Sequence, residues 1–74
     1  KAIINVYPNP VDDVLFINTD ADNYKVAIYD MRGTMIAEYQ NATEIDMSSI
    51  MNGLYFVKVI TNNNQIAVIK IIRR

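Results

Sequence analysis

Apolar residues along this chain either alternate with polar ones or form short blocks, and polar turn residues separate these segments about every 8 to 12 positions. This spacing is typical of sandwiches and barrels made of short antiparallel strands. No segment keeps a helical period for more than about one turn. We therefore predict an all-β fold with strands at residues 3–7, 14–18, 24–29, 34–40, 43–47, 54–61 and 65–73.

Turn-forming residues lie between the predicted strands. The Pro-Asn-Pro sequence at 8–10 ends the first strand, because a proline has no N–H group to donate to a sheet. Asp30 and Gly33 fit the first and last positions of a type I turn. The asparagines at 62–64 tolerate left-handed backbone conformations. The sequence thus predicts two tight hairpins, one after the third strand and one before the last.

The two strands nearest the C-terminus carry apolar residues on both faces, at 54–61 and again at 66–72. A strand at the edge of a sheet offers unpaired backbone groups to other chains. A receptor can use those groups by adding a strand of its own, with side-chain pockets that provide specificity. We therefore expect residues 66–72, together with the basic tail of the chain, to form an element on which a partner protein docks.

Composition indicates a small globular domain. Of the 74 residues, 51% are hydrophobic and 20% are charged, which is typical of a folded chain. The formal net charge is −1, but three of the seven basic residues lie in the last five positions. Three positive side chains are too few for a nucleic-acid surface, and no apolar run approaches the roughly 18 residues of a membrane helix. We predict no nucleic-acid partner and no direct membrane insertion.

The residues used most often in catalysis are missing. The chain has no histidine and no cysteine, and these residues supply many general bases and nucleophiles. Its two serines, Ser48 and Ser49, lie in a predicted turn. Asp20 and Asp22 resemble the start of a calcium loop, but the glycine and glutamate that such a loop requires do not follow. We therefore predict neither an enzyme nor a cofactor or metal site.

Two features admit other interpretations. The five tyrosines and two phenylalanines can provide a stacking surface for sugars, although aromatic residues of a small sandwich more often fill its core. The basic residues at the end of the chain can serve to limit aggregation of an apolar strand. An appended carbohydrate-binding or adhesion module, or a dimerisation module that self-associates through its edge strands, is the alternative function.

Four motifs follow one another along the chain, namely YPNP at 7–10, IYDMRG at 28–33, NGLYFVKV at 52–59 and KIIRR at 70–74. In this order and at these spacings, they make the chain resemble the C-terminal sorting domain of cargo proteins of the type IX secretion system of Bacteroidetes bacteria. The resemblance covers essentially the whole chain.

This resemblance implies an immunoglobulin-like β-sandwich of about seven antiparallel strands. Residues 1–74 would form a single sorting domain at the C-terminus of a longer exported protein. The implied partners are the type IX translocon with its outer-membrane shuttle protein, and a sortase-like peptidase that removes the domain from most cargo. The implied route leads through the periplasm to the outer membrane and the cell surface or the medium, without a cofactor.

The same resemblance assigns roles to individual residues. Recognition by the translocon is expected at Gly53, Tyr55, Lys70, Ile71, Ile72, Arg73 and Arg74. A structural role in turns is expected for Pro8, Asn9, Pro10, Asp30 and Gly33. The recognised surface is therefore expected to lie near the C-terminal end of the chain.

Overall fold

The computed structural model describes all residues, 1–74, and contains seven β-strands and no helix. The strands are β1 (Ile4–Tyr7), β2 (Val14–Thr19), β3 (Tyr24–Tyr29), β4 (Met35–Gln40), β5 (Glu44–Asp46), β6 (Gly53–Thr61) and β7 (Ile66–Arg73). Each strand coincides with one of the seven predicted segments to within one residue at either end. No helix long and apolar enough to cross a membrane is present.

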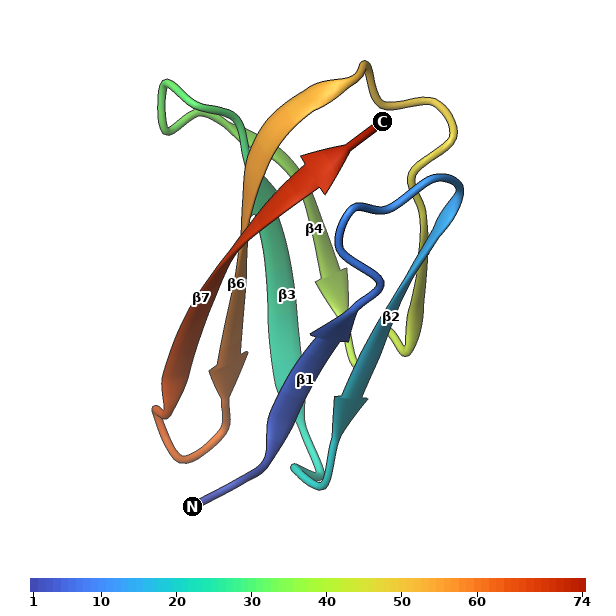
Figure 1. The fold of residues 1–74 in the computed structure, drawn as a ribbon. Helices are drawn as coiled ribbons and strands as arrows, with labels where there is room; N and C mark the ends of the chain where they lie inside the picture. The colour runs from blue at the N-terminus through green and yellow to red at the C-terminus, as the bar shows by residue number, and fades with distance from the viewer.

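The strands form two antiparallel sheets that pack against each other (Figure 1). One sheet has three strands in the order β1-β2-β5, and the other has four in the order β4-β3-β6-β7. Strand β6 lies between β3 and β7, with Val57 opposite Ile28 on one side and Ile69 on the other. The predicted antiparallel β-sandwich is confirmed, and the C-terminal strand β7 is an edge strand.

Both predicted hairpins are present. In the turn between β3 and β4, the Asp30 carboxylate accepts hydrogen bonds from the backbone N–H groups of Arg32 at 2.9 Å and Thr34 at 3.0 Å. Gly33 has a φ of 84°, a conformation that glycine adopts without the steric cost of a Cβ atom. The hairpin between β6 and β7 is closed by a backbone hydrogen bond of 2.9 Å between Thr61 and Gln65.

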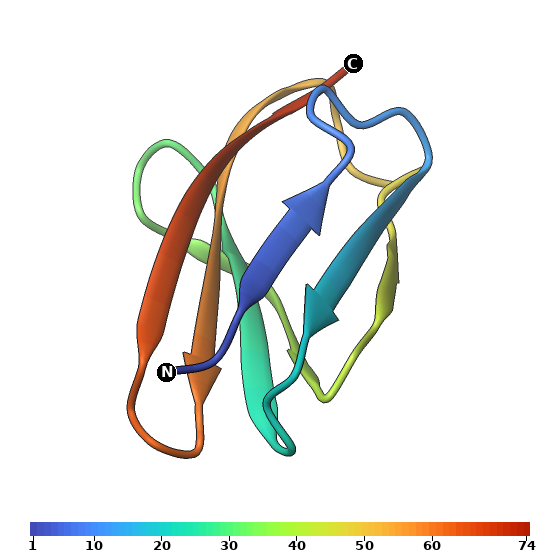
Figure 2. The ribbon, with the colours of Figure 1, turned by 60° about the horizontal axis from the view of Figure 1, so that its bottom comes forward.

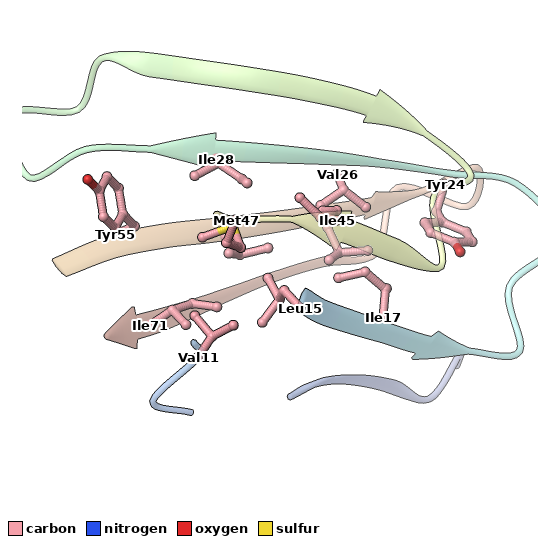
Figure 3. Close-up of a cluster of buried hydrophobic side chains, with 12 residues drawn as sticks. Val11, Leu15, Ile17, Tyr24, Val26, Ile28, Ile45, Met47, Tyr55 and Ile71 are labelled. Atoms are coloured by element: carbon pink, nitrogen blue, oxygen red, sulfur yellow. The ribbon is translucent and has the colours of Figure 1, made fainter. Parts of the chain in front are cut away.

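Alternate side chains of the two sheets point inward and form one core (Figure 3). The core contains Val11, Leu15, Ile17, Tyr24, Val26, Ile28, Ile45, Met47, Tyr55, Val57, Val59 and Ile71. In β6, for example, Val57 and Val59 are buried, whereas Leu54 and Phe56 lie on the outer face and are more exposed. The second apolar face of β6 is therefore on the surface of the sandwich.

The loop between β1 and β2 reaches the edge of the four-stranded sheet before the chain returns to its own sheet. Figure 2 shows the loop that follows β1 beside the C-terminal end of β7. Val11, at the end of this loop, forms a parallel β-bridge with Arg73. The N-terminal segment thus covers part of the edge that β7 would otherwise expose.

Candidate functional site

The side chain of Asn9 occupies backbone groups on the outer edge of β7. Its Nδ2 donates a hydrogen bond to the C=O of Lys70 at 2.9 Å, and its Oδ1 accepts one from the N–H of Ile72 at 3.0 Å. A carboxamide offers one donor and one acceptor side by side, as a neighbouring strand would. We call this pair of bonds the Asn9 clamp.

Val11 continues the coverage toward the C-terminus. Its N–H donates to the C=O of Ile72 at 2.8 Å, and its C=O accepts from the N–H of Arg74 at 3.1 Å. Together with the Asn9 clamp, these bonds satisfy the outer edge of β7 from the Lys70 carbonyl onward. The accessible part of the predicted docking strand is therefore shorter than Ile66–Ile72.

The remaining part of the β7 edge is open. The C=O of Gln65 faces β6, because it accepts the hydrogen bond from Thr61 that closes the hairpin. Alternate residues of an edge strand direct their backbone groups to opposite sides. Ile66, Val68 and Lys70 therefore point their N–H groups away from β6, as Ile72 does, but no segment of the chain pairs with these three N–H groups. We call residues 66–70 the open segment.

A second amide ties the beginning of β7 to the N-terminus. Gln65 Oε1 accepts a hydrogen bond from the N–H of Ala2 at 2.7 Å, and Gln65 Nε2 donates one to the C=O of Ala2 at 2.8 Å. The open segment is thus bounded at one end by the Gln65 amide and at the other by the Asn9 clamp. Nothing in the sequence pattern indicated this role for Gln65. The role depends on the N-terminal segment of one sheet lying beside the first residues of β7 in the other sheet.

The basic tail does not form one continuous positive surface. The Arg73 guanidinium donates to the C=O of Met47 at 2.7 Å and to the C=O of Ser48 at 3.3 Å. Arg74 forms an ion pair with Asp12 at 2.9 Å. Of the three tail cations predicted to be recognised, only Lys70 has an exposed side chain without an anionic or hydrogen-bonding partner.

Two of the predicted recognition residues lie in the core. Tyr55 is 8% exposed, and its hydroxyl donates a hydrogen bond of 2.6 Å to the C=O of Met51. Ile71 is fully buried. The Tyr55 ring lies next to Gly53, which has a φ of 154°. These residues determine the shape of the turn before β6 and the position of β7, and they present no side-chain surface to a partner.

The turn next to the Arg73 guanidinium is held by a carboxylate. The Asp46 carboxylate accepts a hydrogen bond from the N–H of Ser48 at 2.9 Å. The pKa of Asp46 lies below its ordinary value of 3.8, chiefly because the Ser48 hydroxyl and N–H donate to it, with a smaller effect from the charge of Arg73. Asp46 therefore stays ionised at neutral pH and holds the loop that Arg73 also contacts.

The aspartates considered as a calcium loop have another role. The Asp20 carboxylate accepts a hydrogen bond from the N–H of Ile3 at 2.8 Å, and both Asp20 and Asp22 line a shallow polar hollow. No group of three or more histidine, cysteine, aspartate or glutamate side chains lies close enough to hold a metal ion. The segment that contains Asp20 and Asp22 is therefore a polar loop between β2 and β3.

A family model described as "Secretion system C-terminal sorting domain" matches residues 5–74. The chain belongs to this family. No curated protein matches the chain. The sorting domain is thus a C-terminal signal for secretion, and its family is not an enzyme family. A sorting domain of this kind belongs to a cargo protein that is secreted or carried to the cell surface, and it interacts with a secretion system.

Proposed function

We propose that this sorting domain directs its cargo across the outer membrane by docking to the type IX translocon through the open segment of β7. The observation that carries the proposal is the row of outward N–H groups at Ile66, Val68 and Lys70, which no segment of the chain pairs. Ile66 is 55% exposed and Val68 is 60% exposed. Exposed apolar edge strands are surfaces to which a further strand readily adds.

Membership of a sorting-domain family supports a proposed route for the cargo. Residues 1–74 act as one domain at the C-terminus of an exported protein, which reaches the periplasm first. The outer-membrane shuttle protein and the translocon then recognise the domain. In most cargo, a sortase-like peptidase removes it and attaches the cargo to the cell surface.

Within this proposal, the predicted recognition residues have different tasks. Lys70 and the exposed side chain of Ile72 contact the translocon. Gly53, Tyr55 and Ile71 act indirectly, because they fix the turn and the core beneath the edge. Arg73 and Arg74 hold the final residues of β7 against the loops at 47–48 and 11–12, so that the strand keeps one register.

A reporter fused in front of the domain tests the proposal. In a bacterium that has the type IX system, we expect the reporter at the cell surface or in the medium. The matched control is the same reporter without residues 1–74, which should stay in the periplasm. Equal retention of both reporters would contradict the proposed function.

Carbohydrate binding is the second candidate. The rings of Tyr7 and Phe16 stack on the outer face of the three-stranded sheet, with centroids 5.6 Å apart and an angle of 24° between the rings. Tyr7 is 49% exposed, and exposed aromatic rings are common in binding surfaces. This candidate predicts retention of the domain on polysaccharide resins and loss of that retention in Tyr7→Ala. Delivery of the reporter should not depend on Tyr7.

Self-association through β7 is the remaining alternative. An open edge can pair with the same edge of a second copy. Sedimentation of the 74-residue chain at rising concentration measures this directly. A stable dimer at micromolar concentration would favour the dimerisation module, since it would cover the segment that the translocon is proposed to use.

A further inference from the structure

The inner side of β7 is incompletely covered along the open segment. Ala67, Ile69 and Ile71 point toward the same face, yet only Ile71 is fully buried, and the other two are half-buried. Ile71 lies where the N-terminal segment covers the edge, whereas Ala67 and Ile69 lie within the open segment. A strand added there would cover apolar surface that the domain itself leaves partly exposed.

The outer side of the same segment carries two lysines beside the exposed apolar side chains of Ile66 and Val68. Lys70 lies opposite Phe56, and Lys58 lies opposite Val68, so both lysines are on the outer face of the β6–β7 pair. Neither lysine takes part in an ion pair. The carboxylate of this face, Glu38 on β4, is on the opposite edge of the sheet and pairs with Lys25 at 3.8 Å.

We infer that the partner element that docks on the open segment is a β-strand with alternating apolar and acidic side chains. Its apolar side chains pack over Ala67 and Ile69, and its acidic side chains lie on the outer face near Lys58 and Lys70. This inference rests on the proposed function, since it states which chemistry the translocon presents to β7. Side chains of a strand alternate between two faces, so one sequence satisfies both requirements.

The Asn9 clamp limits the length of that strand. From Lys70 onward, the outer backbone groups of β7 already bind Asn9 and Val11. The backbone pairing of the partner strand is therefore limited to residues 66–70. The Gln65 amide, which binds the backbone of Ala2, lies at the other end of the open segment. Pairing beyond Lys70 requires the Asn9 amide to leave the β7 backbone.

A second copy of the chain fits this surface less well than an acidic strand. Antiparallel pairing of two β7 edges would place Lys58 and Lys70 of each copy on one continuous face. No carboxylate of β6 or β7 is available to offset these charges. Pairing of two copies over residues 66–70 would therefore leave these lysines without a counter-charge, whereas an acidic strand supplies one, and the charges favour an acidic partner.

Peptide binding to the 74-residue chain tests the inference. The probe is a peptide of about eight residues in which valine and glutamate alternate, and the matched probe has lysine in place of glutamate. In an NMR titration, we expect the amide signals of Ile66, Val68 and Lys70 to shift and to become protected from hydrogen exchange. We expect the glutamate peptide to bind on the order of tenfold more tightly than the lysine peptide.

Reversing the charge of the two lysines provides a second test of the inference. The double variant Lys58→Glu with Lys70→Glu should prefer the lysine peptide. Lys25→Glu on β3, which is separated from β7 by β6, should keep the original preference. Equal binding of the two peptides, absence of binding, or shifts that map away from β7 would overturn the inference. The reporter assay separates the two proposals. If the reporter is delivered but the domain does not prefer the glutamate peptide, only the inferred chemistry of the partner strand is overturned. If the domain prefers the glutamate peptide but the reporter is not delivered, the proposed function is overturned.

Discussion

The side-chain oxygen of Asn9 accepts a hydrogen bond from the N–H of Ile72 at 3.0 Å, and so connects residues that are 63 positions apart in the chain. The Pro-Asn-Pro motif and the C-terminal motif are therefore parts of one structure. An edge strand that is covered at its end and open in its middle offers a partner one defined site, and it limits pairing along the rest of the edge.

Removing the Asn9 clamp should loosen the end of β7. Asn9→Ala deletes two hydrogen bonds to the β7 backbone, and we expect a loss of about 1–2 kcal/mol in the free energy of unfolding. Hydrogen exchange at the Ile72 amide should accelerate. Asn63→Ala, in the exposed loop between β6 and β7, is the matched control and should change stability by less than about 0.5 kcal/mol. Equal effects of the two variants would contradict the clamp.

The hydroxyl of Tyr55 should stabilise the turn before β6. Tyr55→Phe keeps the buried ring but removes the hydrogen bond to the C=O of Met51, and we expect a cost of about 1 kcal/mol in urea unfolding. Tyr7→Phe removes a hydroxyl that makes no hydrogen bond within the domain. It should therefore leave the unfolding midpoint nearly unchanged, and a similar loss in both variants would argue against a specific role of the Tyr55 hydroxyl.

The β3–β4 turn should lose stability in acid. Hydrogen bonds from the Thr34 and Arg32 N–H groups, with the charge of Arg32, lower the pKa of Asp30 below its ordinary value of 3.8. A lowered folded-state pKa gives a stabilisation that is present above the unfolded-state pKa and is lost as the pH falls through the folded-state value. Asp30→Asn should therefore lower the melting temperature at about pH 7, with the difference from wild type disappearing toward about pH 2.

Two measurements bear on this expectation for Asp30. Thermal melts of both proteins across this pH range give the difference directly, and a difference that stays constant into acid would disprove the role of the charge. Asp22→Asn is the control at neutral pH, since the Asp22 carboxylate accepts no hydrogen bond from the chain. Its melting temperature at about pH 7 should equal that of the wild type.

Substitutions of Arg73 and Lys70 should have different effects on the stability of the domain and on its recognition by the translocon. Arg73→Ala removes the guanidinium that donates to the Met47 and Ser48 carbonyls, and we expect a loss of about 1–2 kcal/mol in stability. Lys70→Ala should change stability by less than about 0.5 kcal/mol, because its side chain has no partner within the domain. Delivery of the reporter should nevertheless fall in Lys70→Ala. Normal delivery by this stable variant would remove Lys70 from the recognised surface.

Much of the fold follows from the alternation of apolar residues and the chemistry of the turns. The seven strands were predictable because each apolar segment is bounded by polar turn residues, such as Asp30 and Gly33 in the first hairpin. The hairpin at 62–64 was predictable from asparagines, and Asn64 adopts a φ of 63°. These signals are local, so they need no knowledge of which strands meet in space.

The arrangement of the candidate site was less predictable, because it depends on contacts between distant segments. Since β7 is apolar on both faces, alternation alone does not reveal whether Arg73 or Lys70 points inward. The structure places Arg73 on the same face as Ile71, where its guanidinium reaches the loop at 47–48. In the same way, Asn9 lies in a turn motif, and only the position of β7 beside it reveals what the amide binds.

The most direct test of recognition through the open segment is delivery of the reporter by Val68→Pro. The Val68 N–H points away from β6, so proline removes an outward donor without breaking the β6–β7 ladder. Val68→Ala is the matched control, since it trims the exposed side chain but keeps the N–H group. We predict that the Val68→Pro domain stays folded and that its reporter remains in the periplasm, whereas the Val68→Ala reporter is delivered. Delivery of the Val68→Pro reporter at the wild-type level would contradict the account.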